Sequence, residues 1–297
     1  MTSGGFHIRQ LTVVGLGLMG GSMALALRDY ADNICGVDPS SSTRCYAVEN
    51  GIVDHATDDL KEGVAEADVV ILAAPVRVVV EMLGRRIGSY LRSNTLLIDL
   101  GSTKRDIIDA MGRLPIGVQA IGGHPMTGKE RSGVEASDAN LYEGRPFVLC
   151  ETRRATPATR LRALGLVNAI RALPIEMDAE RHDRVVATIS HLPYLLSAAM
   201  VATVAEEADK DDAVWQLASG GFRDMSRLTG SNIQMMSDIV STNTQAIAVL
   251  LAQFRMQLAL LEKMLIGRDD KELADALHPV REARLHWFDN YGGKGNL

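Results

Sequence analysis

Residues 11–21 read LTVVGLGLMGG, an apolar β-branched run followed by a glycine-rich turn and the start of a helical pattern. The glycines have the GxGxxG spacing, which combines a tight turn with close approach of the backbone to a ligand. The helix after this turn would present free N–H groups and its positive dipole end to a phosphate. The spacing could also be a plain tight turn, but its place between strand and helix favours a dinucleotide-binding loop. The residues assigned to the dinucleotide are Gly15, Gly17, Leu18, Met19 and Gly20.

A carboxylate ends the second predicted strand. Asp38 lies where it can accept hydrogen bonds from an adenosine ribose, although it could also only cap the next turn. Its negative charge would oppose the additional 2′-phosphate of NADP, so the sequence favours NAD. Arg44 and the serines at 40–42 could weaken that repulsion, which leaves NADP possible.

Short β-branched runs alternate with helical patterns from residue 10 to about residue 178. This alternation is typical of βαβ units, whose apolar strands form a mostly parallel sheet with helices on both faces. The predicted strands are 11–14, 34–37, 69–73, 95–100, 118–121, 147–149 and 174–177. We therefore predict an α/β fold with a doubly wound, Rossmann-type domain over residues 1–177.

No strand pattern returns after Met177, so we predict an all-α C-terminal domain over residues 178–297. Asp178 is placed to cap its first helix, which runs to about residue 206. Pro193 should kink or divide that helix, because proline lacks the N–H group that a helix interior needs.

A second long helix is predicted from Ser231 or Asn232 to about Ile266. It carries one apolar stripe with alternating steps of three and four residues and a second stripe alongside. The two stripes are Ile247, Leu251, Phe254, Leu258, Leu261 and Leu265, and Val249, Leu250 and Leu260. Each stripe needs an apolar surface to cover it. One stripe could pack on the core of its own chain and the other on a second copy, so we predict a homodimer through this domain. The alternative is that both stripes are buried within one chain.

The composition excludes several classes of function. Of 297 residues, 46% are hydrophobic and 23% charged, as in ordinary globular proteins, and the net charge of −6 gives no general attraction to nucleic acid. The most apolar stretches, 69–83 and 246–266, are interrupted by polar residues, so we expect no membrane span. Three cysteines without metal-site spacing and a polar N-terminus predict a cytoplasmic protein with free thiols and no metal.

Polar residues gather in two segments at the carboxyl ends of predicted strands, where a doubly wound sheet binds ligands. One segment holds Ser102 and Lys104, and the other holds His124 between two glycines and a proline. A neutral imidazole at this place could take a proton from a substrate hydroxyl near pH 7. The alternatives are a structural histidine, a serine that only caps the next helix, and a lysine that is only a surface charge.

The helical domain adds histidines and arginines. His182 and His191 lie nine residues apart, which is half a turn out of phase on a regular helix, so they should not share a metal ion unless the proline kink intervenes. A later glycine-rich segment carries Arg223 and Arg227. Either guanidinium could bind a carboxylate with two parallel hydrogen bonds or pair with Asp224 at the surface.

Five segments together resemble the prephenate/arogenate dehydrogenases of tyrosine biosynthesis. They are VVGLGLMGGS at 13–22, DLGSTK at 99–104, GGHPMTGKERSG at 122–133, HDRVVATISHLP at 182–193 and SGGFRDMSRL at 219–228. The ordered set spans nearly the whole chain and is far more specific than any one segment. The resemblance implies oxidative decarboxylation of prephenate or arogenate to 4-hydroxyphenylpyruvate or tyrosine, with hydride passing to the nicotinamide.

The resemblance also implies roles for individual residues. His124 would accept the proton of the ring hydroxyl, Ser102 would help to hold that hydroxyl, Arg227 would bind a substrate carboxylate, and His182 would line the same cleft. Tyr194 departs from the pattern, because many relatives that use prephenate have a histidine there. A neutral tyrosine would repel the ammonium group of arogenate less than a protonated histidine, which favours arogenate or the use of both substrates.

Two other functions are compatible with parts of the sequence. A β-hydroxyacid dehydrogenase has a similar glycine loop and a helical second domain, but Lys210 and Lys263 lack the motif expected around its lysine. A non-catalytic NAD-binding sensor would not need His124, Ser102 and Arg227.

Overall fold

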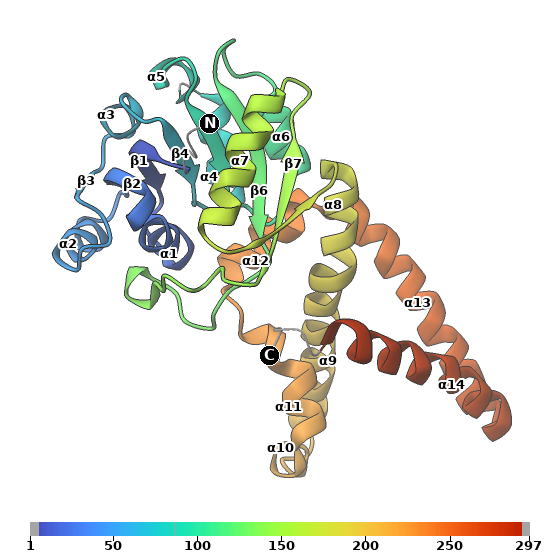
Figure 1. The fold of residues 1–297 in the computed structure, drawn as a ribbon. Helices are drawn as coiled ribbons and strands as arrows, with labels where there is room; N and C mark the ends of the chain where they lie inside the picture. The colour runs from blue at the N-terminus through green and yellow to red at the C-terminus, as the bar shows by residue number, and fades with distance from the viewer. Residues whose placement is uncertain (1–5, 86, 293–297) are drawn as a thin grey trace. The chain divides into compact units, whose positions relative to one another are not determined.

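The structure is a computed structural model that describes residues 6–85 and 87–292 (Figure 1). The chain separates into two compact units, Met1–Asn243 and Thr244–Leu297. The first unit contains the sheet and most of the helices, and the second contains the last two long helices. The predicted domain boundary at residues 177 and 178 lies inside the first unit, where strand gives way to helix, and it stays a prediction.

An eight-stranded sheet forms the centre of the first unit, in the order β3-β2-β1-β4-β5-β6-β7-β8. The strands are β1 (Ile8–Val14), β2 (Ala31–Val37), β3 (His55–Thr57), β4 (Val69–Leu72), β5 (Leu96–Asp99), β6 (Gln119–Pro125), β7 (Pro146–Glu151) and β8 (Leu173–Glu176). Neighbouring strands are parallel, except for the antiparallel pair β6 and β7. The doubly wound, mostly parallel sheet is confirmed, and its order reverses at β1 and β4, where such sheets bind their ligands.

All seven predicted strands are present, and β3 is an addition. It is missed because its three residues, HAT, form no apolar run. It lies at the edge of the sheet, where its parallel pairing with β2 places it. A strand this short is fixed by its neighbour and not by its own sequence pattern.

The central strands are buried on both faces, as the continuous apolar runs predict. In β1, Leu11 and Val13 contribute to one buried layer, whereas Val14 contributes to the other. The helices of the first layer are α1 (Leu18–Ala26), α2 (Ser41–Glu49) and α7 (Pro157–Ala169). Those of the second layer are α3 (Leu60–Val64), α4 (Val76–Gly84), α5 (Ile87–Tyr90) and α6 (Arg105–Met111). The sheet therefore lies between two helical layers (Figure 1).

The helical part of the first unit begins at α8 (Ala179–Val186). Asp178 caps it as predicted, since its carboxylate accepts a hydrogen bond from a backbone N–H of the first turn. A π-helical turn, Ala187–His191, separates α8 from α9 (Leu192–Ala208). Pro193 lies at the start of α9, where its missing N–H is tolerated. The helical stretch continues from Ala179 to Ala208, and its irregular turn lies just before the proline, so the predicted kink or division at Pro193 stays a prediction.

The predicted single helix from residue 231 or 232 to about 266 is wrong. After α10 (Ala213–Leu217) and α11 (Gly220–Ser226) come two separate helices, α12 (Ile233–Thr242) and α13 (Thr244–Gly267). Asn232 caps α12 as predicted. The chain leaves helical geometry at Asn243, where φ is −129° and ψ is 26°. The side chain of Asn243 donates a hydrogen bond to the Asp183 carbonyl oxygen at 2.7 Å, a tertiary contact that the sequence pattern does not reveal.

The described residues of the second unit form α13, the helix α14 (Asp270–Trp287) and a short π-helical turn. Among the residues of α13, only Ile247 is buried. Stripe residues such as Val249, Leu258 and Leu265 are 56%, 49% and 63% exposed. The homodimer and the alternative in which one chain buries both stripes therefore both stay predictions.

Two helical stretches, Ala179–Ala208 and Thr244–Gly267, are long and apolar enough to cross a membrane by length and composition alone. An apolar helix of this length also suits a face that another protein surface covers. The expectation that the chain does not span a membrane stays a prediction.

Candidate active site

The glycine loop between β1 and α1 has the geometry that its spacing predicts. Gly15 has a φ of +93°, and a Cβ there would lie 2.8 Å from the carbonyl oxygen of Ala73. A Cβ on Gly20 would lie 1.8 Å from the carbonyl oxygen of Gly15. Gly17 differs, because a Cβ on it would meet open space at the N-terminus of α1, which has no side-chain cap. Gly15 and Gly20 are therefore required because a larger residue would clash with the backbone. Gly17 leaves open space at the helix N-terminus, a cradle in which a pyrophosphate could bind.

Asp38 has the structural role that the sequence leaves open for it, and its predicted contact with a ribose stays a prediction. Its carboxylate accepts hydrogen bonds from the N–H of Leu16 and the N–H of Ser40, both at 2.9 Å, so it braces the glycine loop and also begins the next turn. Arg44 does not pair with this carboxylate. Its guanidinium donates to the Asp38 carbonyl oxygen at 2.7 Å and lies 2.9 Å from the Asp58 carboxylate. Arg44 is thus already occupied and is a poor candidate for binding a 2′-phosphate.

Lys104 is not a surface charge. Its side chain is completely buried and forms an ion pair with the equally buried carboxylate of Asp99, the last residue of β5. The same carboxylate accepts hydrogen bonds from the N–H of Gly101 at 2.7 Å and from the N–H of Gly123 at 3.1 Å. Asp99 therefore ties the segment that carries Ser102 to the strand that carries His124.

Ser102 does not cap the helix next to it. The N-terminus of α6 is instead held by Asp183 on α8, whose carboxylate accepts from the N–H groups of Lys104 at 2.7 Å and Arg105 at 2.9 Å. Ser102 is half-buried, and its hydroxyl has no hydrogen-bond partner among the described residues. The hydroxyl thus remains available to a ligand.

His124 lies within β6 and not in a loop, which corrects the sequence prediction. The preceding Gly123 makes this possible, because a Cβ there would lie 2.5 Å from the carbonyl oxygen of Asp99. His124 Nδ1 lies 2.8 Å from Nε2 of His182, and the two rings meet edge to face. Burial, reinforced by the charges of His182 and other basic neighbours, holds the pKa of His124 well below its usual range. The ring is therefore neutral near pH 7, as a general base must be.

The π-helical turn brings His182 and His191 closer in phase than a regular helix would. One inserted residue rotates the rest of the helix by about 100°. His191 Nδ1 lies 3.2 Å from Nδ2 of Asn243, and burial lowers the pKa of His191 to about 4. Over the described residues, no three His, Cys, Asp or Glu side chains are grouped as metal ligands. The absence of a metal stays a prediction.

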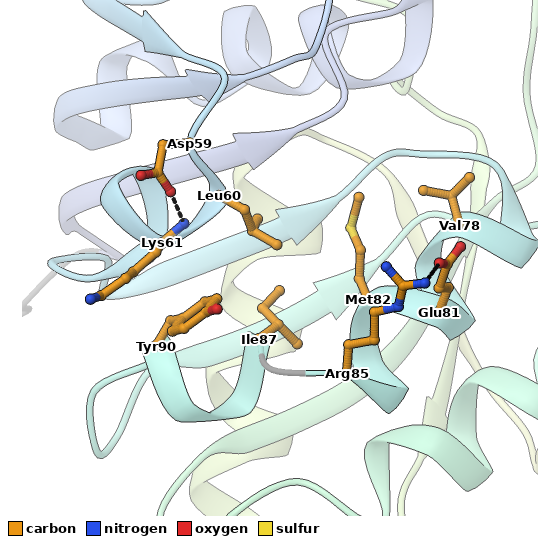
Figure 2. A pocket seen from close by; sticks show the side chains of 9 residues that line it. All are labelled: Asp59, Leu60, Lys61, Val78, Glu81, Met82, Arg85, Ile87 and Tyr90. Atoms are coloured by element: carbon orange, nitrogen blue, oxygen red, sulfur yellow. Dashed lines mark hydrogen bonds and ion pairs between the residues drawn. The ribbon is translucent and has the colours of Figure 1, made fainter.

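The structure also has a cavity of about 690 Å³ that is unrelated to these residues. It lies beside α3, α4 and α5, and Figure 2 shows the side chains around it, among them Lys61, Met82 and Tyr90. None of the predicted site residues lines it. We place the candidate active site at the carboxyl ends of the strands instead, because the paired histidines and the glycine cradle lie there.

Models of one protein family match both parts of the chain. Residues 23–171 match the prephenate dehydrogenase nucleotide-binding domain, and residues 178–279 match the prephenate dehydrogenase dimerization domain. The chain belongs to the prephenate dehydrogenase family. It is therefore an oxidoreductase with a Rossmann-type nucleotide-binding domain. This membership decides against a β-hydroxyacid dehydrogenase and opposes a non-catalytic sensor.

Similar proteins within the family carry related names. The prephenate dehydrogenase of Bacillus subtilis (strain 168) is 34% identical over 240 residues, which are 80% of this chain and 65% of that protein. This chain thus spans just under two thirds of that relative's length. The crystal structure of A. aeolicus prephenate dehydrogenase with hydroxyphenyl propionate and NAD⁺ matches with a TM-score of 0.85 and 28% identity, over 94% of this chain and 98% of that one. The crystal structure of Synechocystis arogenate dehydrogenase matches with a TM-score of 0.81 and 30% identity, over 94% of this chain and 99% of that one.

Arg227 and Tyr194, the other two residues predicted to bind the substrate, form fewer hydrogen bonds with the protein than His124 and His182 do. Arg227 is exposed at the end of α11 and has no side-chain partner among the described residues. Arg223 instead pairs with its neighbour Asp224 at the surface, at 3.2 Å. Tyr194 is partly buried in the first turn of α9. The structure therefore brings together His124 and His182, but it does not join Arg227 or Tyr194 to them by a hydrogen bond.

Proposed function

We propose that this protein oxidatively decarboxylates prephenate, arogenate or both, with NAD⁺ as hydride acceptor, in tyrosine biosynthesis. The observation that carries the proposal is the neutral His124 imidazole, held through Nδ1 by His182 at the carboxyl end of the sheet. The half-buried Ser102 hydroxyl on the adjoining segment and the cradle at Gly17 support it. Family relatives named prephenate dehydrogenase and arogenate dehydrogenase have the same fold.

Each residue has a defined task in this reaction. The glycine loop and the N-terminus of α1 would hold the dinucleotide pyrophosphate, and Asp38 would hold the ribose. Bound NAD⁺ supplies the acceptor for the hydride that leaves the ring carbon bearing the hydroxyl. His124 takes the hydroxyl proton as that oxygen becomes a carbonyl, and Ser102 holds the oxygen in place. The bond to the ring carboxylate then breaks, CO₂ leaves, the electron pair makes the ring aromatic, and the proton returns to the phenolic oxygen.

Parallel kinetics test the proposal. The enzyme is incubated with NAD⁺ and either prephenate or arogenate, and NADH and CO₂ are followed together. Equal amounts of both products with at least one substrate are expected, and Tyr194 leads us to expect that arogenate is used. Reduction of NAD⁺ without release of CO₂ would contradict the proposal, and so would binding of NAD⁺ and substrate without turnover.

Arg227→Ala should raise KM for the substrate by about 10- to 100-fold, because a hydrogen-bonded charge is lost from the ground and transition states alike. We expect a much smaller change in kcat. Arg223→Ala is the matched comparison, since Arg223 pairs with Asp224 at the surface. A larger increase in KM for Arg223→Ala than for Arg227→Ala would reverse the assignment.

The cofactor preference should follow the charge of Asp38. We expect kcat/KM with NAD to exceed that with NADP at least tenfold, because the carboxylate repels a 2′-phosphate and Arg44 is held by Asp58. Asp38→Asn keeps an acceptor for the N–H of Leu16. It should lower the ratio of kcat/KM with NAD to kcat/KM with NADP about tenfold. A preference for NADP in the unaltered enzyme would contradict the assignment.

We propose that the protein is a homodimer. The match to a dimerization domain and the exposed apolar stripes of α13 support this. Sedimentation at micromolar concentration should give twice the chain mass of 32.1 kDa. A stable monomer would end the proposal.

We further propose that the protein acts in the cytoplasm. Cys35, Cys45 and Cys150 are free thiols, as the sequence predicts. Thiols that persist unpaired suit a reducing compartment, where a biosynthetic dehydrogenase also finds its cofactor.

A further inference from the structure

We propose that Asp183, acting through His182, is a positioning residue that fixes which ring nitrogen of His124 carries the basic lone pair and that gives the abstracted proton a second place to reside. The inference rests on the proposed function, since it concerns the base of that reaction. Asp183, His182 and His124 together form a relay.

The relay is continuous and largely buried. Oδ1 of Asp183 lies 2.8 Å from Nδ1 of His182, and Nε2 of His182 lies 2.8 Å from Nδ1 of His124. The side chains of His182 and Asp183 are buried, whereas His124 is partly exposed at the end of the sheet. The chain of contacts therefore leads from a buried carboxylate to an imidazole that a substrate can reach.

The carboxylate of Asp183 is held in place as a hydrogen-bond acceptor. It accepts hydrogen bonds from the backbone N–H groups of Lys104 and Arg105 at 2.7 and 2.9 Å. Asn243 donates to the Asp183 main-chain carbonyl oxygen and so fixes the backbone at this position. An ionised carboxylate has only acceptor atoms, so it cannot donate to a histidine.

The direction of each hydrogen bond is set by this carboxylate. His182 must donate from Nδ1 to Asp183, so with one proton on the ring its Nε2 accepts. His124 must then donate from Nδ1 to His182, which leaves the lone pair of His124 on Nε2. That nitrogen is the one not engaged with the protein, so the relay presents the base outwards.

The relay also provides a route for the proton. When Nε2 of His124 takes the substrate proton, the Nδ1 proton of His124 can pass to Nε2 of His182. One N–H bond forms and one breaks on His124, and His182 becomes the cation, next to the Asp183 carboxylate. The reverse transfer returns the proton to the phenolic oxygen after CO₂ leaves. No other reactant is needed.

The charges around the relay favour this transfer. Burial and the nearby charge of Lys104 oppose a positive charge on His124, whereas the Asp183 carboxylate attracts one on His182. Lys104 is itself paired with Asp99, and the buried thiol of Cys150 lies on β7, beside β6. The electrostatic balance therefore places a transient positive charge deeper in the protein than the base itself.

Neutron diffraction on unliganded enzyme crystals exchanged into D₂O tests the tautomers without any turnover. We expect deuterium on Nδ1 of both His124 and His182, and none on Nε2 of either ring. Deuterium on Nε2 of His124 would overturn the proposal. If the enzyme shows the expected tautomers but oxidises neither prephenate nor arogenate, the relay is supported and the proposed function is wrong.

Asp183→Asn provides the kinetic test. An asparagine amide turned towards His182 would donate to Nδ1, which forces both rings into the opposite tautomer and puts a proton on Nε2 of His124. We expect kcat to fall about 10²-fold with KM nearly unchanged, and deuterium to appear on Nε2 of His124. Asp59→Asn is the matched control, because the Asp59 carboxylate also accepts hydrogen bonds from two backbone N–H groups, at the N-terminus of α3. Equal effects of the two substitutions would mean that Asp183 is only a helix cap.

A pair of substitutions at His182 keeps the proposal testable if the Asp183 variant does not fold. The amide oxygen of His182→Gln can accept from Nδ1 of His124 and preserve its tautomer, whereas His182→Leu cannot. We expect kcat of the glutamine variant to be at least tenfold higher than that of the leucine variant. Equal kcat values would show that His182 only fills space.

Discussion

Asparagine in place of His124 should lower kcat by about 10²- to 10⁴-fold at neutral pH, the range that a general base contributes. The reason is geometric. The amide of asparagine can occupy the position of Nδ1 and keep a hydrogen bond to His182, but it has no group at the position of Nε2. The substitution thus removes the base and leaves the anchoring contact of 2.8 Å in place.

Initial rates with NAD⁺ and saturating substrate measure this effect. KM should change far less than kcat, because the proton is transferred only in the transition state. His55→Asn is the control, since His55 is an exposed histidine on β3, at the edge of the sheet. Near-normal turnover of the His124 variant would refute its role as base.

The pH profile of the unaltered enzyme provides a second test of the same assignment. Burial and basic neighbours lower the pKa of His124, so the neutral ring persists to lower pH than a free histidine allows. The acid limb of kcat/KM should therefore lie below pH 6.5, the usual value for histidine. An acid limb above that pH would contradict a neutral, buried base.

The parts of this site that are local in sequence could be predicted from it. The glycine loop is defined by steric demands between near neighbours, and the caps at Asp178 and Asn232 each depend on a backbone N–H three residues away. The sheet class could also be predicted, because each buried strand carries its own apolar run. These features need no knowledge of how distant segments pack.

The contacts that define the relay could not be predicted in the same way. His124 and His182 are 58 residues apart, and their hydrogen bond depends on how α8 packs against the end of the sheet. Asp183 directly follows His182 in the sequence, so the adjacent pair was visible, but nothing in it showed that the carboxylate would also hold α6. Asn243 likewise looked like an ordinary position in a long helix, but its backbone is not helical and its side chain contacts Asp183 and His191, which are far away in the sequence.

The burial of the charged side chain of Lys104 could not be predicted from the sequence either. In the sequence it follows a serine and a threonine and precedes an arginine, so nothing distinguishes it from a surface lysine. Its burial is explained only by Asp99 at the end of β5, five residues earlier, which supplies a partner inside the sheet. A buried lysine without such a partner would be too costly to keep charged.

Lys104→Met should therefore destabilise the protein by about 3–5 kcal/mol, the usual cost of removing one partner from a buried ion pair. Methionine fills a similar volume, so the loss arises mainly from the unpaired carboxylate of Asp99. That carboxylate would retain its hydrogen bonds from Gly101 and Gly123, which stabilise its charge only in part. Denaturant unfolding followed by circular dichroism measures the change in free energy of unfolding.

The double variant Asp99→Asn/Lys104→Met separates lost charge pairing from lost packing. It buries no charge, and the asparagine carbonyl oxygen can still accept a hydrogen bond from a glycine N–H, so most of the stability should return. If the two substitutions were instead additive, the pair would contribute through packing and not through its charges. A stable double variant with low kcat would further show that Asp99 matters for catalysis by holding Ser102 and His124 in register, since it bonds to the glycines beside both.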